Sequence, residues 1–152
     1  MHYQQFFSRP AGEVAPDLLG RLLTATTEKK VITGRILETG AYQEGNEIPS
    51  RAGMKYPPGT IFLMPHRGFL LFNIATAREG YPSCIEIRRV AFEDRTVNGP
   101  GAASKAFGIT NDLDGILLGE QVQITGERIE QSLIVRQDGK ADNCLGYFSI
   151  KV

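Results

Sequence analysis

The chain has 152 residues, of which 41% are hydrophobic and 22% charged, and its 17 basic side chains balance 17 acidic ones. This composition is typical of a single globular domain whose core needs neither disulfides nor a structural metal. Cys84 and Cys144 lack metal-binding spacing and suit a reducing compartment, and one disulfide between them stays open. The balanced charge argues against wholesale electrostatic binding to polyanions.

Several classes of function are disfavoured by missing motifs. No apolar run approaches the ~18 residues of a membrane span, and the first residues lack a secretory-signal pattern. We therefore expect a protein of a bacterial cytoplasm or a nucleus, neither secreted nor membrane-embedded. With only His2 and His66 present, and without Walker, GxGxxG or GxSxG motifs, we expect no metal and no cofactor. Carboxylates, tyrosines and arginines remain as candidate chemical groups.

The first elements are predicted from glycine and proline spacing and from apolar periodicity. Most segments between these residues alternate with a period of two, which predicts a β-rich domain. Residues 13–23 (EVAPDLLGRLL) instead carry apolar side chains at helical spacing and predict one short helix, with Pro16 in its first turn.

A long strand is predicted over residues 31–42 (VITGRILETGAY). Its period of two places Glu38, Gly40 and Tyr42 on one face. An acid, a glycine and an aromatic side chain therefore share one line along the sheet. Residues 43–58 are polar and rich in Gly and Pro, so this loop is a candidate wall of a site.

The remaining elements continue the β-rich pattern. Residues 59–64 and 68–76 predict two strands joined through the tip PHRG at 65–68. Further strands are predicted by SCIEIRRVAF, QVQIT, SLIVRQ and GYFSIKV, and a short helix is predicted within NGPGAASKAFGI. Asn98 is placed to cap that helix.

In this order, a series of sequence blocks resembles the alkyladenine (3-methyladenine) DNA glycosylase family. The blocks are FFSRP, DLLGRLL, GRILETGAYQEG, PPGTIFL, the hairpin with Asn73, IEIRR, NGPGAASKAFGI and GYFSIKV. The resemblance covers nearly the whole chain and implies one mixed α+β domain over residues 1–152, with a curved antiparallel sheet, a few short helices and a protruding β-hairpin. It implies an enzyme that flips a damaged purine from duplex DNA and hydrolyses its N-glycosidic bond without a metal.

The resemblance also implies roles at matching positions of the ETGAY segment. Gly40 stands where the family has the glutamate that activates the attacking water, so the general-base position is vacated. Tyr42 matches the tyrosine that stacks on the flipped base, and Pro49 stands where the family has a histidine facing that base. Glu38, about 7 Å along the same strand face, is a candidate substitute base. Glu44 and Glu47 are weaker candidates of the same kind.

Further roles fall on the hairpin and on the segments that follow it. His66 and Arg67 stand where the family inserts a side chain into the duplex, since a guanidinium can stack on bases and contact phosphate. Asn73 and Arg88 match residues of the pocket floor. Asn98, Gly99 and Lys105 are candidate phosphate contacts at the start of the short helix.

Each assignment has a structural alternative. Glu38 is either a base or a carboxylate that pairs with Arg35 or Arg88, and Tyr42 is either a stacking platform or a core aromatic. Three functions follow: a monomeric glycosylase acting on duplex DNA with a damaged purine, an inactive relative that binds damaged DNA or a nucleotide, or a β-rich interaction domain. Between Arg51 and Thr110 there are eight basic and four acidic residues, an asymmetry suited to a modest DNA-binding face.

Overall fold

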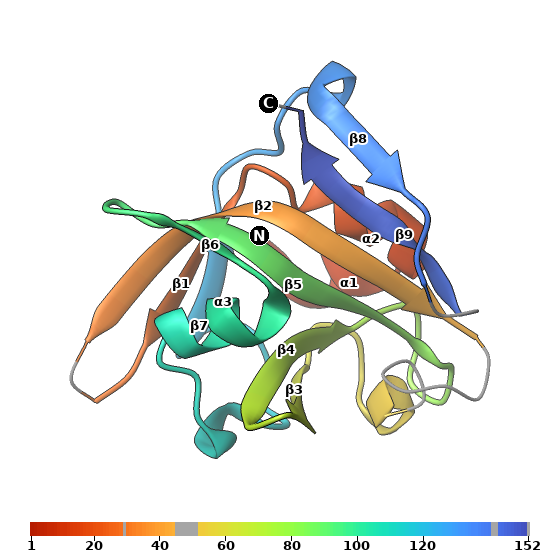
Figure 1. Ribbon diagram of the computed structural model, residues 1–152. Coiled ribbons are helices and arrows are strands. Elements are labelled where there is room, and N and C mark those ends of the chain that lie inside the picture. The colour runs from red at the N-terminus through yellow and green to blue at the C-terminus, as the bar shows by residue number, and fades with distance from the viewer. Residues whose placement is uncertain (29, 45–51, 141–142, 152) are drawn as a thin grey trace.

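One long central strand organises the sheet. The computed structural model describes residues 1–28, 30–44, 52–140 and 143–151, and in it β2 spans Val31–Gln43. The first half of β2 pairs with β1 (Leu22–Thr26), the second half with β9 (Cys144–Ile150), and β5 (Ser83–Ala91) lies along its other side. Because β2 has these three antiparallel neighbours, it links both ends of a strongly curved sheet (Figure 1).

The other elements extend this arrangement. The path β3-β4-β5-β2-β1-β7 runs across the sheet, β6 pairs with β5, and β8 pairs with β9. The remaining strands and helices are α1 (Tyr3–Phe7), α2 (Ala11–Asp17), η1 (Ala52–Lys55), β3 (Ile61–His66), β4 (Phe69–Ala75), β6 (Thr96–Asn98), α3 (Pro100–Ala106), η2 (Asn111–Leu113), β7 (Val122–Thr125), η3 (Gln131–Leu133) and β8 (Ile134–Gln137).

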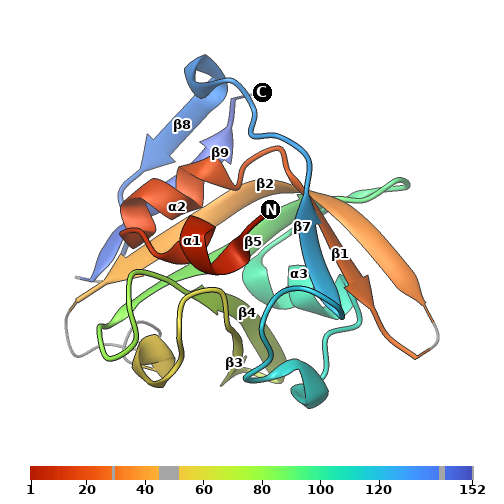
Figure 2. The same cartoon turned by 180° about the vertical axis from the view of Figure 1, so that it is seen from behind.

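The α-helices cover different faces of the sheet. In Figure 1, α3 lies in front of the sheet, where it contacts β4 and β5. Figure 2, seen from behind, shows α1 and α2, and α2 contacts β2, β5 and β9. Phe107 beyond α3 and Val14 on α2 belong to the same buried cluster. The predicted class, a mixed α+β domain with a curved antiparallel sheet and a few short helices, is confirmed.

The predicted helix over residues 13–23 is wrong in its extent. The helix α2 ends at Asp17, Pro16 lies near its end rather than in its first turn, and Leu22 already belongs to β1. Gly20, with a φ of 86°, turns the chain between them. Pairing of β1 with β2 therefore overrides the helical spacing of the leucines.

The hairpin tip is tighter than predicted. The strands β3 and β4 continue through Pro65 and His66, so the turn consists of Arg67 and Gly68 alone. Their φ values are 49° and 84°, both in the left-handed region that a two-residue hairpin turn requires. Glycine adopts this conformation readily, whereas Arg67 does so at a cost. The tip residues are exposed.

Close packing at Gly34 yields a stability prediction. A Cβ added to Gly34 would lie 3.0 Å from Phe92 Cε1 and would overlap Val90, so Gly34→Ala forces buried side chains apart. We expect the free energy of unfolding to fall by about 1–3 kcal/mol in urea denaturation. Gly12→Ala on α2 is the matched control, because its Cβ meets Leu145 at an ordinary 3.4 Å. Equal effects of the two substitutions would contradict the packing argument.

Candidate active site

A cross-strand row of residues passes through Gly40, the position predicted from the sequence to have lost the general base of the family. Gly40 on β2 lies opposite Tyr147 on β9 and opposite Glu86 on β5, and Glu86 lies opposite Asn73 on β4. Residues directly opposite each other in a sheet share a face and have Cβ atoms about 5 Å apart. The row therefore places side chains from three strands, β9, β5 and β4, beside Gly40. We call this row, together with Glu38, Tyr42 and Arg88, the Gly40 site.

The guanidinium of Arg88 joins the two carboxylates of the site. Its Nε donates to Glu38 Oε2 at 3.2 Å and its Nη1 donates to Glu86 Oε1 at 2.8 Å. Its Cζ lies 3.9 Å from the centroid of the Tyr147 ring, within range of a cation–π interaction. The predicted pairing of Glu38 with Arg88 is confirmed, although it leaves the catalytic role of Glu38 a prediction.

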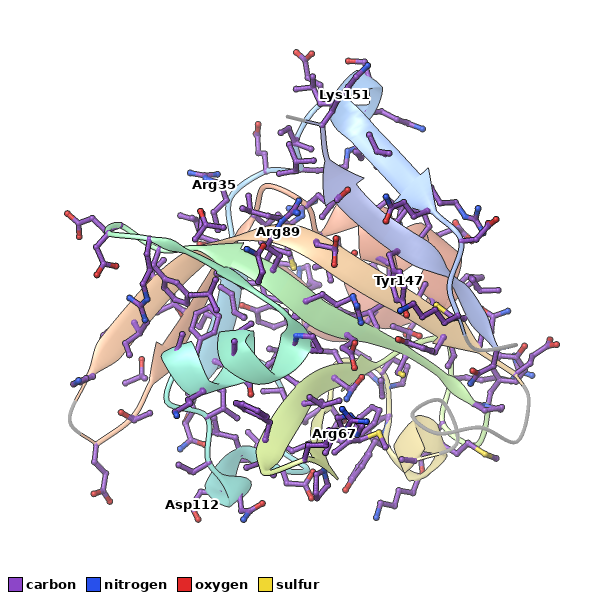
Figure 3. All side chains as sticks on the ribbon, in the orientation of Figure 1. Arg35, Arg67, Arg89, Asp112, Tyr147 and Lys151 are labelled. Atoms are coloured by element: carbon purple, nitrogen blue, oxygen red, sulfur yellow. The ribbon has the colours of Figure 1, made fainter. Side chains whose placement is uncertain are left out.

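The space above Gly40 is filled by its neighbours. A Cβ added at Gly40 would lie 3.2 Å from Arg88 Cδ, 3.2 Å from Tyr42 Cε2 and 3.3 Å from Tyr147 Cδ1. Glu38, Gly40 and Tyr42 therefore share the predicted face. Figure 3 shows Tyr147 on β9, and between it and Arg67 at the hairpin tip lie β2, β5 and β4. A ligand that enters above Gly40 must displace the side chains of Arg88, Tyr42 and Tyr147 or stack over them.

Tyr42 is more buried than a simple stacking platform would be. Its side chain packs with Phe62, Ala75 and Cys84 in a second buried cluster. Burial raises the pKa of the Tyr42 hydroxyl well above its ordinary value, and the charge of Glu86 and the neighbouring Tyr147 hydroxyl act in the same direction. The hydroxyl stays protonated at neutral pH and can donate a hydrogen bond.

Glu86 is the most deeply placed carboxylate of the Gly40 site. Its side chain is 5% exposed, compared with 22% for Glu38. Burial raises the pKa of the Glu86 carboxyl above its ordinary value, and the Arg88 guanidinium opposes this rise to a smaller extent. A poorly hydrated carboxylate with a raised pKa, directly opposite Gly40 in the sheet, has properties that suit a general base.

Asn73 is fully buried and hydrogen-bonded within its own hairpin. Its Nδ2 donates to the Leu71 carbonyl at 3.2 Å, and the Cys84 thiol lies 4.0 Å from its Oδ1. These contacts fit the structural alternative for Asn73, and a role in binding substrate stays a prediction. Both cysteines, Cys84 and Cys144, are free thiols.

The predicted DNA-contact residues lie at the hairpin tip and near α3. His66, Arg67 and Lys105 are exposed. The expected cap by Asn98 is wrong, because the N-cap of α3 is Gly99 and no side chain caps it. Gly99 has a φ of 102°, so this turn takes a backbone conformation that favours glycine.

The hairpin and α3 are packed directly against each other. A Cβ at Gly101 would lie 2.6 Å from Phe69 Cγ, so the helix approaches β4 closely at this point. The contact couples Phe69, the first residue of β4 after the turn, to α3. The start of β4 and α3 are therefore neighbours.

The predicted loop at 43–58 contains the two weaker candidates for the general base, Glu44 and Glu47. It also contains Pro49, which stands where the resemblance predicts a histidine. Glu44 accepts a hydrogen bond from the Tyr81 hydroxyl at 2.7 Å. Glu47 and Pro49 lie outside the described residues.

Glu86 and Tyr147 are the two site residues that the sequence reasoning missed. The alternation of β5 already placed Glu86 on the face of Cys84 and Arg88, which was an available signal. Tyr147 gave no such signal, because its place depends on the pairing of β9 with β2.

The described residues contain no group of three His, Cys, Asp or Glu side chains that could hold a metal ion. Over the same part of the chain, no helix is both long and apolar enough to cross a membrane.

Comparison with known proteins identifies the family. The sequence model described as Methylpurine-DNA glycosylase (MPG) matches residues 5–138. A relative from Staphylococcus saprophyticus is 31% identical over 76% of this chain and 68% of its own length, and one from Bacillus velezensis is 31% identical over 80% and 75%. For a relative from Lactobacillus johnsonii the values are 28%, 73% and 66%. All three are provisionally named 3-methyladenine DNA glycosylases.

The chain therefore belongs to the methylpurine-DNA glycosylase family. It spans about two thirds to three quarters of the length of these curated relatives.

The raised pKa of Glu86 yields a prediction for the dependence of stability on pH. A carboxyl whose folded-state pKa exceeds its unfolded value binds its proton more tightly in the native state. Its contribution to stability is therefore present below the ordinary carboxyl pKa and is lost as pH rises towards the folded-state pKa.

We expect the free energy of unfolding of the wild type, relative to Glu86→Gln, to fall as pH rises through that window. Urea denaturation of both proteins at several pH values between about 4 and 8 measures this difference, and subtraction cancels groups that titrate alike in both proteins. A difference that does not change with pH would contradict the assignment.

Proposed function

We propose that this protein binds duplex DNA, everts an alkylated purine nucleotide and hydrolyses its N-glycosidic bond. The observation that carries the proposal is membership of the methylpurine-DNA glycosylase family over residues 5–138. It is supported by the grouping of Glu38, Tyr42 and Arg88 on one face of the sheet. The protein is proposed to act as a monomer, without metal or cofactor.

The chemistry asked of this site depends on the leaving group. A purine alkylated at a ring nitrogen carries positive charge and departs readily, so positioning a water and stabilising the sugar cation go far towards catalysis. The N-glycosidic bonds of neutral lesions break more slowly without catalysis, and a general base raises the rate of hydrolysis by about 100- to 10,000-fold. Glu38, oriented by Arg88 Nε, is the base proposed from the sequence.

The proposed DNA surface combines the hairpin tip with α3. Arg67 and His66 are exposed at the tip, and Lys105 is exposed in the last turn of α3. Arg67 has a backbone in the left-handed region of a two-residue turn, and its side chain is exposed. Strained residues of this kind are concentrated at functional sites, which supports a role for Arg67 as the wedge.

A second function is an inactive family member that binds damaged DNA or a nucleotide without cleaving it. The observation that favours it is the crowding of Gly40 by Arg88, Tyr42 and Tyr147, together with the burial of Tyr42. In that case the ion pairs of Arg88 would serve only to hold the strands together.

Base release separates these functions. Duplexes carrying 3-methyladenine, 7-methylguanine, hypoxanthine or ethenoadenine are incubated with the protein, and free base is measured by chromatography. We expect release of the cationic bases to exceed that of the neutral ones, because their bonds need less assistance. Lesion-selective binding with no release from any duplex would favour the inactive member. Equal affinity for damaged and undamaged duplex would favour an interaction domain that does not read damage.

The wedge assignment predicts opposite effects on binding and stability. Arg67→Asn removes the guanidinium and places a residue that tolerates the left-handed region in the turn. We expect duplex affinity to fall severalfold while the free energy of unfolding rises by up to ~1 kcal/mol.

Fluorescence anisotropy at several salt concentrations and urea denaturation measure the two effects. Lys30→Gln is the matched control, because Lys30 is exposed between β1 and β2, away from β3 and β4 in the sheet order. Unchanged affinity in Arg67→Asn would exclude the wedge role.

A further inference from the structure

The general-base position of the family is vacated on β2, yet a carboxylate stands directly opposite it on β5. Gly40 and Glu86 are cross-strand partners, so their side-chain directions share one face of the sheet. We propose that Glu86 is the catalytic residue that activates the attacking water, in place of a side chain at Gly40. This inference rests on the proposed glycosylase function and assigns its base to a residue that the sequence reasoning did not select.

The contacts of Arg88 place the Glu86 carboxylate beside the vacated position. Arg88 Cδ lies 3.2 Å from where a Cβ of residue 40 would stand, and Arg88 Nη1 lies 2.8 Å from Glu86 Oε1. The side chain that covers Gly40 is therefore the one that binds Glu86. A carboxylate reaching from the neighbouring strand serves the same region of the sheet face as one rising from Gly40.

Glu86 is better suited to proton transfer than Glu38. Its side chain is 5% exposed against 22% for Glu38, and it lies in the row of Gly40, whereas Glu38 lies two positions along the strand. Arg88 engages Oε1 of Glu86, and among the described residues no donor binds Oε2. That oxygen is free to accept a hydrogen bond from the attacking water.

The surroundings of Glu86 also favour a stronger base. Burial raises the pKa of its carboxyl, and Arg88 lowers it by less, so the carboxylate gains basicity while it stays oriented. The other titratable groups on this face are Glu38 and Tyr42 from β2, Cys84 from β5, and Cys144 and Tyr147 from β9. The Tyr42 hydroxyl remains a protonated donor at neutral pH, because burial raises its pKa.

The chemical step balances without a further reactant. The water oxygen bonds to C1′ of the deoxyribose as one of its protons passes to Glu86. The bond between C1′ and the purine nitrogen breaks, and its electron pair leaves with the base. A cationic alkylated purine thereby departs as a neutral molecule, and Glu86 later returns its proton to solvent. A neutral purine such as hypoxanthine departs as an anion and becomes neutral by taking up a proton from solvent. In both cases the sugar keeps a hydroxyl at C1′.

Single-turnover release of 3-methyladenine and hypoxanthine, measured from pH 5 to 9, tests the proposal. We expect Glu86→Gln to slow hypoxanthine release about 100-fold or more. It should slow 3-methyladenine release less and abolish the fall in rate at low pH. Glu38→Gln should slow base release less than Glu86→Gln does, because it removes only the ion pair between Glu38 and Arg88. Glu127→Gln, an exposed carboxylate beyond β7, should keep the wild-type rate.

The outcomes separate this inference from the proposed function. A wild-type protein that releases no base overturns both. An active wild type, with an unchanged rate and pH profile in Glu86→Gln, overturns the assignment of Glu86 alone. A larger loss in Glu38→Gln than in Glu86→Gln also overturns it and returns the role to Glu38. If Glu86→Gln does not fold, Glu86→Asp, which keeps the charge but withdraws the carboxylate, should slow release at least tenfold, and a wild-type rate would overturn the assignment.

A relocation variant gives the sharpest control. Gly40 has an extended strand backbone, and an added Cβ needs Arg88, Tyr42 and Tyr147 to shift by only a few tenths of an ångström. Gly40→Glu introduced into Glu86→Gln should release base at least tenfold faster than Glu86→Gln alone, since a carboxylate is restored to the same region. A double variant that stays at the rate of Glu86→Gln would overturn proton transfer in favour of a structural role.

Discussion

The Arg88 guanidinium is the group on which the rest of the site depends. It is bound by carboxylates from two strands and stacked on an aromatic ring from a third. A carboxylate as buried as Glu86 is tolerated only beside such a partner, because an unpaired charge there would cost several kcal/mol. The same guanidinium lies over the Tyr147 ring, and the Arg88 side chain covers Gly40.

The fold was largely predictable because strand periodicity is a local property. The alternation over β2 correctly placed Glu38, Gly40 and Tyr42 on one face, and the hairpin of β3 and β4 followed from its apolar flanks. The helix predicted over 13–23 failed because leucines at helical spacing also suit a buried strand once β2 is available as a partner. Local pattern does not reveal that competition.

The site was less predictable because its geometry comes from register. Family resemblance predicts roles for Tyr42 and Arg88 and predicts that Gly40 replaces the glutamate of the family, and these assignments stay predictions. It did not indicate that Glu86 lies opposite Gly40, since that fact depends on the register of two strands that are separated by 39 residues, 44–82. Tyr147 is farther still, and its block lies beyond the segment matched by the family at 5–138.

The pairing of β9 with β2 also sets an order of assembly. Tyr147 meets Gly40 only after a strand about one hundred positions later in the chain has been synthesised and has joined the sheet. Such distant pairings form slowly, because loop closure precedes the contacts that stabilise it. During synthesis the partly emerged chain therefore holds Arg88 without its aromatic partner, and the Gly40 site reaches its final form only when β9 has joined the sheet.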